Sequence, residues 1–116
     1  MLRNEAMKVY LYCGITDMRK SINTLAIMVQ DTLELDPSSG HLFLFRNRGR
    51  DKLKALYYDD GSYTLWYRRL EKGKFIFPRN DTGHIELDEA HFDWLLSSNK
   101  YSKIIGEETQ KYRDFC

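Results

Sequence analysis

Turn-forming segments divide the middle of the sequence into short runs of β-favouring residues, and this spacing limits the folds that the chain can adopt. Each segment contains Gly, and most add Asp, Asn, Ser or Pro, the residues that favour tight turns. The four segments are 36–40, 47–51, 59–61 and 71–73. The runs between and after them predict consecutive antiparallel strands at 41–46, 52–58, 62–70 and 74–77.

A strand and a helix are predicted before these turns. Residues 8–13 are β-rich and alternate in polarity, and Gly14 ends the run. Apolar side chains then recur at helical spacing as far as about Leu33. Asp17 or Thr16 can cap the start of this helix, because a side-chain oxygen there accepts from a free backbone N–H.

A second helix is predicted after Asp88, another capping residue. It is expected to run for about nine residues, with Phe92 and Leu95 facing inward. Residues 98–116 have little hydrophobic periodicity and are expected to form a loosely packed tail. The chain therefore divides into a single domain, 7–97, and this tail.

The order of these elements, with a short extended segment at 85–87, predicts an α+β fold. We expect a mostly antiparallel β-meander sheet, with the N-terminal helix and the short C-terminal helix packed on one face. The 116 residues, 42% of them hydrophobic, suffice for one modest core. The other face of the sheet is then left to solvent or to a partner.

Basic side chains concentrate in the centre of the chain. Residues 41–79 carry ten basic and four acidic side chains, so the formal net charge of +1 hides a polarised molecule. Within the centre a basic residue stands at every second position: Arg46, Arg48, Arg50, Lys52 and Lys54. Like charges this close repel one another, so they add little to folding unless an anion or acidic partner lies nearby. A hairpin that carries them can present the charge to a phosphate backbone.

The basic surface continues beyond this run. Arg68, Arg69 and Lys72 extend it, and Trp66 and Tyr67 lie among them. Cations that contact phosphates, interleaved with aromatics that stack on bases, are typical of nucleic-acid surfaces. Two plainer interpretations stay open: the basic residues form a solvated surface, and the aromatics belong to the core.

Arg19 and Lys20 form a second basic pair at the start of the first predicted helix. Backbone N–H groups at a helix N-terminus favour anions, which makes this pair a secondary candidate anion site. The alternative is that Asp17 only caps the helix and that the two cations are solvated.

The sequence favours a protein without catalysis, metal or cofactor. Its three histidines are scattered, and its two cysteines form neither a metal-ligand pattern nor a disulfide framework. A metal-dependent nuclease is the enzymatic alternative, with Asp59, Asp60 or Glu71 as candidate carboxylates. The chain shows no signal-peptide pattern and no apolar run of membrane-spanning length, so we expect a cytoplasmic protein with no membrane partner.

Three blocks of the chain, in this order, resemble a known family. They are GITDMRKSIN at 14–23, DPSSGHLFLFRNRGRDKLK at 36–54 and LWYRRLEKGKF at 65–75, with Pro78 closing the last. Together they are similar to the accessory transposition protein of the insertion-sequence family numbered sixty-six, the TnpB-like product of the second reading frame. The resemblance covers about residues 7–97. At position 49 this chain has Gly, where the family often has a further basic residue.

The resemblance implies a helper role in bacterial DNA transposition, beside a separate and larger transposase that holds the catalytic acidic residues. With the basic surface, it leads us to expect a non-enzymatic, DNA-binding accessory protein. Its expected partners are DNA, the transposase of the same element and a second copy of the chain. The alternative is a protein-interaction module whose basic surface docks on the transposase.

Overall fold

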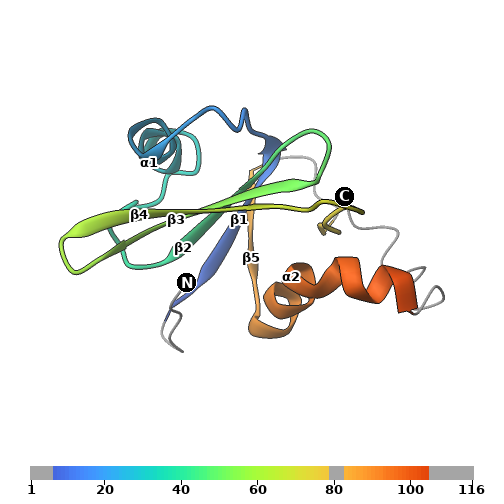
Figure 1. Cartoon of the computed structure of the whole chain (residues 1–116). Helices are drawn as coiled ribbons and strands as arrows, with labels where there is room; N and C mark the ends of the chain where they lie inside the picture. Colours follow the sequence, from blue (N-terminus) through green and yellow to red (C-terminus); the bar gives the residue numbers. More distant parts are fainter. Residues whose placement is uncertain (1–6, 79–82, 105–116) are drawn as a thin grey trace.

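The computed structural model describes residues 7–78 and 83–104, with side chains described as far as residue 97. Within these residues, a five-stranded sheet lies between two helices (Figure 1). The elements are β1 (Val9–Ile15), α1 (Ile22–Asp31), β2 (Leu42–Arg46), β3 (Lys52–Asp59), β4 (Ser62–Arg69), β5 (His84–Leu87) and α2 (Glu89–Ile104). The predicted α+β class is therefore confirmed. None of the helices in the described residues is long and apolar enough to cross a membrane.

The sheet has the strand order β4-β3-β2-β1-β5 and is mixed. The predicted meander is present, because β2, β3 and β4 pair in sequence and antiparallel. The central pair, β1 and β2, is parallel, whereas β5 pairs antiparallel with β1. Parallel neighbours need a long crossover connection, and α1 supplies it here. The sheet is thus not strictly antiparallel.

One face of the sheet, which we call the α1 face, packs against the first helix. Phe43 and Phe45 of β2 and Leu56 of β3 form a buried cluster on this face. Leu25 and Val29 of α1 join that cluster, and both are fully buried. Their spacing of four residues places them on the same side of the helix, as the apolar periodicity predicts.

The opposite face, the α2 face, packs against the second helix. Leu42 and Leu44 of β2 form its cluster with Leu11 of β1, and Phe92 and Leu95 of α2 complete it. Figure 1 shows the two helices on opposite sides of the sheet. The prediction that both helices pack on one face is therefore wrong. Apolar side chains point to both faces of the central strands, so each face needs its own cover.

The segment after β4 was predicted to contain another strand, but residues 74–78 do not pair as one. Their aromatic side chains are nevertheless core residues, since Phe75 and Phe77 lie in the cluster on the α2 face. The N–H of Phe75 donates to the carbonyl of Arg50 at 2.7 Å, and the N–H of Leu70 donates to that of Asp51 at 2.8 Å. The segment is thus tied to the connection between β2 and β3.

The two helices begin differently from one another. Asp88 caps α2 as predicted, because its Oδ1 accepts from the N–H of His91 at 2.8 Å. The residue before α1 is Ser21, and its side chain makes no capping hydrogen bond. The prediction that Asp17 or Thr16 caps α1 is wrong.

The second helix is longer than predicted. It has 16 residues and continues through 98–104, which were assigned to the C-terminal tail. Residues 105–116, the rest of that predicted tail, lie outside the described residues.

Candidate nucleic-acid interface

The parallel pairing of β1 and β2 brings two basic loops to one edge of the sheet. Strands that run in the same direction end at the same edge, and ligand sites of α/β proteins commonly form in the crevice beyond such ends. Here Ile15 is in register with Arg46, and the N–H of Thr16 donates to the carbonyl of Arg46 at 2.8 Å. Residues 16–21, after β1, therefore lie beside residues 47–51, after β2 (Figure 1).

A hollow of about 470 Å³, which we call the basic groove, lies between these two loops. It is lined by Ile15 at the end of β1, by residues 16–19 of the first loop and 47–49 of the second, and by Lys52 and Tyr67 of the neighbouring strands. The groove contains residues of both candidate sites, because Arg19 of the secondary pair lines the same hollow as Arg48 and Lys52 of the central run. This association depends on the parallel pair.

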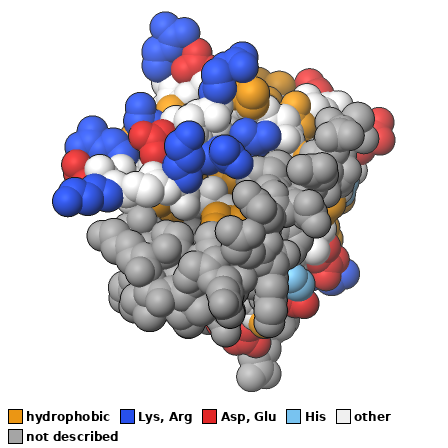
Figure 2. All heavy atoms as spheres, turned by 90° about the vertical axis from the view of Figure 1, so that its right-hand side faces the viewer, with side chains coloured by type: hydrophobic (Ala, Val, Ile, Leu, Met, Phe, Trp, Pro, Cys, Tyr) orange, Lys and Arg blue, Asp and Glu red, His pale blue; other side chains and the backbone are white. Residues whose placement is uncertain are grey.

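Several cations at this edge are not neutralised by a salt bridge within the part of the chain that the structure describes. Among the described residues, Arg48, Arg50 and Lys52 form no salt bridge. Lys52 also stands opposite Arg69 in the ladder between β3 and β4, and like charges in that position destabilise a sheet. Arg69 is paired with Glu71 at 3.2 Å, but both side chains are largely exposed. Figure 2 shows Lys and Arg side chains gathered over one part of the described surface.

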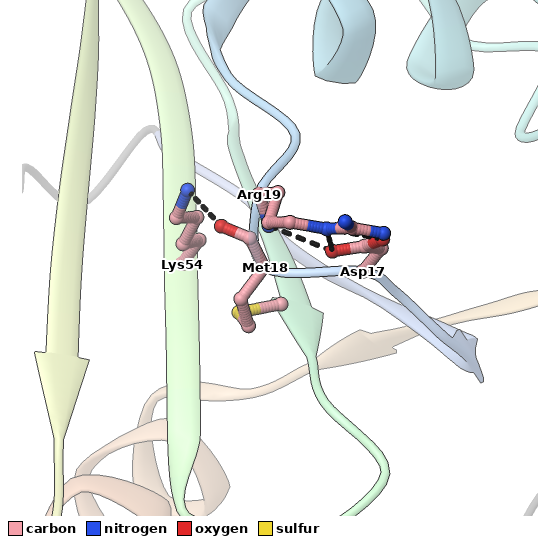
Figure 3. Close-up of polar contacts among 4 residues, drawn as sticks. All are labelled: Asp17, Met18, Arg19 and Lys54. Atoms are coloured by element: carbon pink, nitrogen blue, oxygen red, sulfur yellow. Dashed lines mark hydrogen bonds and ion pairs between the residues drawn. The ribbon is translucent and has the colours of Figure 1, made fainter.

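The secondary basic pair is partly neutralised. Arg19 Nη2 lies 2.6 Å from Asp17 Oδ2, and Arg19 Nε donates to the same carboxylate (Figure 3). The backbone N–H of Arg19 also donates to Asp17 Oδ1 at 2.9 Å. These hydrogen bonds hold the pKa of Asp17 well below its usual value, so the carboxylate stays ionised at neutral pH. Lys20 has a backbone role, since its carbonyl accepts from Lys54.

Lys54 holds the first loop against the sheet. Its Nζ donates to the carbonyl of Met18 at 2.6 Å, as Figure 3 shows, and to that of Lys20 at 2.7 Å. The same ammonium lies 5.6 Å from the centre of the Tyr67 ring, a cation–π contact. Lys54 was predicted to contact phosphate, and two of the three N–H donors of its ammonium are used by these carbonyls.

Arg46 is likewise engaged within the fold. Its Nη2 donates to the carbonyl of Cys13 at 3.2 Å, and its Nη1 to that of Asn47 at 3.4 Å. The guanidinium lies 5.7 Å from the ring centre of Phe77, on the α2 face. It therefore connects the ends of β1 and β2 to the segment after β4.

The remaining predicted residues divide between the two faces. Trp66 packs against the core cluster on the α2 face, away from the basic groove. Arg68 is in register with Leu53 and shares that face, whereas Tyr67 points to the α1 face and lines the groove. Lys72 lies in the exposed turn after β4. Of the two aromatic candidates, Tyr67 alone lines the groove.

The β2–β3 connection is held in shape by Asn47. Its Oδ1 accepts from the N–H groups of Asp51 and Lys52, and its Nδ2 donates to Asp51 Oδ1 at 2.7 Å. The hydrogen bond from Asn47 lowers the pKa of Asp51. Arg50 adopts a left-handed backbone with φ 59°, which is uncommon for a residue other than Gly or Asn. This loop therefore presents Arg48 and Arg50 from a defined backbone.

Six residues that line the groove were not predicted as site residues: Ile15, Thr16, Asp17, Met18, Asn47 and Gly49. Asn47 carried a readable signal, because Asn side chains commonly organise turns through hydrogen bonds to their own backbone. No sequence signal indicated that Ile15 would be exposed, because a β-branched residue in a strand is expected to pack in the core. Asp17 was predicted to cap a helix, so its pairing with Arg19 was not expected.

The candidate nuclease carboxylates do not come together. Asp59 ends β3 and Asp60 lies in the turn before β4, where Asp60 and Gly61 both have positive φ, and Glu71 follows the other end of β4. Eight residues of extended strand, about 25 Å, separate the turn from Glu71. Within residues 7–78 and 83–104, His, Cys, Asp and Glu nowhere form a group of three able to hold a metal ion.

The chain is thus a small α+β protein whose basic groove lies at the carboxyl ends of two parallel strands. A model of the IS66 Orf2-like protein family matches residues 7–105, so the chain belongs to the IS66 Orf2-like family. This confirms the resemblance found in the sequence. The family is one of accessory proteins of insertion sequences, and membership indicates an accessory role in transposition, with partners such as the transposase.

Two curated relatives, both from Sinorhizobium fredii (strain NBRC 101917 / NGR234), are similar over most of their length. The uncharacterized protein y4hO is 37% identical over 91 residues, which is 78% of this chain and 79% of that protein. The uncharacterized protein y4jC is 32% identical over 101 residues, 87% and 86% of the two chains. No solved structure matches the chain with significant similarity.

The Asp17–Arg19 pair leads to a first prediction, which concerns DNA affinity. If the basic groove binds DNA, an Asp17→Asn variant should bind it several-fold more tightly at low salt, with a log-log salt dependence that is steeper by up to about 0.9 in slope. The amide still accepts from the N–H of Arg19, but it no longer neutralises the guanidinium. Fluorescence anisotropy titrations at several salt concentrations measure both quantities.

Asp36→Asn is the matched control for this prediction. Asp36 accepts from the N–H of Ser38 in a similar turn, and it lies before β2, at the opposite edge of the sheet from the groove. Equal gains in affinity for the two variants would show that net charge alone is responsible, and would contradict a local role for Asp17.

Proposed function

We propose that this chain is a non-enzymatic accessory protein that binds DNA through the basic groove and the adjoining β2–β3 connection. Arg48, Arg50 and Lys52 contact backbone phosphates, and Arg19 contributes from the facing loop. Arg69, Lys72 and Arg68 extend the field around this centre. Arg46 and Lys54 shape the groove rather than bind phosphate.

The observation that carries this proposal is the convergence, on one hollow, of cations that form no salt bridge within the described part of the chain. Arg48 and Lys52 line it and have no salt bridge among the described residues. Bringing such charges together is unfavourable unless an anion binds between them. Phosphate contacts through Arg and Lys position DNA without reading its sequence, which suits an accessory role.

The proposal is tested by measuring DNA affinity as salt rises, for the wild type and for a triple variant: Arg48→Ala, Arg50→Asn and Lys52→Ala. Asn is chosen at position 50 because it tolerates the left-handed backbone there. We expect affinity at low salt to fall at least about tenfold and the log-log slope to fall by about 2–3, since each lost phosphate contact removes about 0.9.

Lys8→Ala is the control, compared with the single Arg48→Ala variant. Lys8 is exposed and precedes β1, so it lies at the opposite edge of the sheet from the groove. Arg48→Ala should reduce the slope and Lys8→Ala should not. Indistinguishable binding by the wild type and the triple variant would refute the proposal.

A basic groove can also accept carboxylates, so the transposase is the second candidate ligand. The observation in its favour is that Arg48, Arg50 and Lys52 would pair with an acidic protein surface as readily as with phosphates. Co-purification with the transposase that survives nuclease treatment, together with no DNA binding by the wild type, would favour this alternative.

A further inference from the structure

The basic groove contains apolar surface as well as charge. Among the described residues, three large hydrophobic side chains are exposed: Ile15 at 48%, Tyr67 at 49% and Ile27 at 57%. Ile27 lies on the outer side of α1, whereas Ile15 and Tyr67 both line the groove. Phosphate binding alone explains the cations of the groove but gives no reason for an exposed tyrosine and isoleucine among them.

The ring of Tyr67 is held in a defined place. Lys54 lies 5.6 Å from its centre, and the ammonium of Lys54 is itself fixed by the carbonyls of Met18 and Lys20. A tyrosine held in this way keeps half of its surface exposed at low conformational cost. Such a ring can stack on a planar ligand without first being ordered.

A DNA base is a planar group that occurs beside phosphates, but in a duplex its faces are covered by the neighbouring base pairs. A single strand can turn its bases outward, and proteins bind single strands through aromatic platforms set in positive grooves. The combination seen here is of that kind, with Tyr67 and Ile15 as the apolar surface and Arg48, Lys52 and Arg19 around it.

We infer that the basic groove binds unpaired DNA, with a base stacked on Tyr67 and the adjoining phosphates held by Arg48 and Lys52. This inference rests on the proposed DNA-binding function and adds the kind of DNA that the groove recognises. Ile15 supplies the apolar edge of the base site. Duplex DNA reaches only the cations, so it binds more weakly than a single strand of equal length.

Three fluorescein-labelled ligands of equal length separate base stacking from phosphate contact: oligothymidine, its duplex with oligoadenosine, and an abasic single strand. The abasic strand has the same phosphates but no bases. At one salt concentration, the wild type should bind oligothymidine more tightly than either of the other two. Tyr67→Ala should weaken oligothymidine binding by about tenfold and leave the other two affinities unchanged.

Two further variants identify the cause. Tyr67→Phe keeps the ring and should retain the wild-type affinity for oligothymidine. Ile27→Ala removes an exposed apolar side chain that lies outside the groove, and it should change none of the three affinities. Thermal denaturation of each variant shows whether it is folded, and the ratio of oligothymidine to abasic affinity is read within one variant, so partial unfolding does not alter it.

The outcomes distinguish this inference from the proposal beneath it. If Tyr67→Ala leaves that ratio unchanged while the triple cation variant loses affinity, the protein binds DNA but does not stack a base on Tyr67. If the wild type prefers the duplex, the inference is also wrong. If the wild type binds none of the three ligands, the inference and the proposed function fail together.

Discussion

An Arg46→Ala variant is expected to lose about 2 kcal/mol of unfolding free energy, while its folded fraction binds DNA as the wild type does. The guanidinium donates to the carbonyls of Cys13 and Asn47 and lies against Phe77. Truncation leaves both carbonyls without this donor and removes the guanidinium that packs against the Phe77 ring. Arg46 Nε is buried without a hydrogen-bond partner among the described residues. Removing this unpaired group is favourable, and this offsets part of the stability that the variant loses.

Arg48→Ala is the matched control for this prediction, because it removes the same charge two residues along the chain. Arg48 is exposed and makes no salt bridge among the described residues, so its loss should change stability by less than about 0.5 kcal/mol. Urea denaturation measures stability, and salt titration of DNA binding measures phosphate contact. If Arg46→Ala is as stable as the wild type but has a lower salt slope, Arg46 is a phosphate contact and its structural role is refuted.

These two neighbouring arginines show what the sequence could and could not predict about the site. The alternating run directed attention to this edge of the sheet, because concentrated charge is visible in the sequence. It could not separate Arg46 from Arg48, since the difference is whether backbone carbonyls lie within reach. Those carbonyls belong to residues such as Cys13, which is 33 positions away.

The strands of the meander were predictable because turn chemistry is local. Glycines and Asp residues mark the ends of β2, β3 and β4, and the predicted strands differ from the observed ones by one residue at some ends. The parallel pairing of β1 and β2 could also have been predicted, because the order of strand, helix and strand is that of a crossover connection. The prediction instead extended the antiparallel pairing of the hairpins that follow to the rest of the sheet.

The two-sided core could likewise have been inferred from β2. Residues 42–45 read Leu-Phe-Leu-Phe, and all four side chains are fully buried. An unbroken apolar run is typical of a strand that is covered on both faces, whereas a strand with one solvated face alternates with polar residues. The helices on opposite faces follow from this pattern. The length of α2 was harder to predict, since its later residues lack a clear apolar period.

A Lys54→Met variant is expected to lose about 2 kcal/mol of unfolding free energy and several-fold in DNA affinity. Met preserves the length of the side chain but cannot donate to the carbonyls of Met18 and Lys20. The loop at 16–21 then loses its attachment to β3, and with it the placement of Arg19. Denaturation in urea measures the stability, and faster amide hydrogen exchange at 16–21 identifies the segment that is released.

Lys72→Met separates loss of charge from loss of this attachment. Lys72 lies in an exposed turn, so its replacement removes one positive charge from a solvated side chain. We expect unchanged stability and unchanged exchange at 16–21 for Lys72→Met. Exchange at 16–21 should be faster only in Lys54→Met, because the Lys54 ammonium fixes the loop that forms one wall of the groove. If the two variants show equal stability and equal exchange, Lys54 contributes charge alone and the groove is held by other contacts.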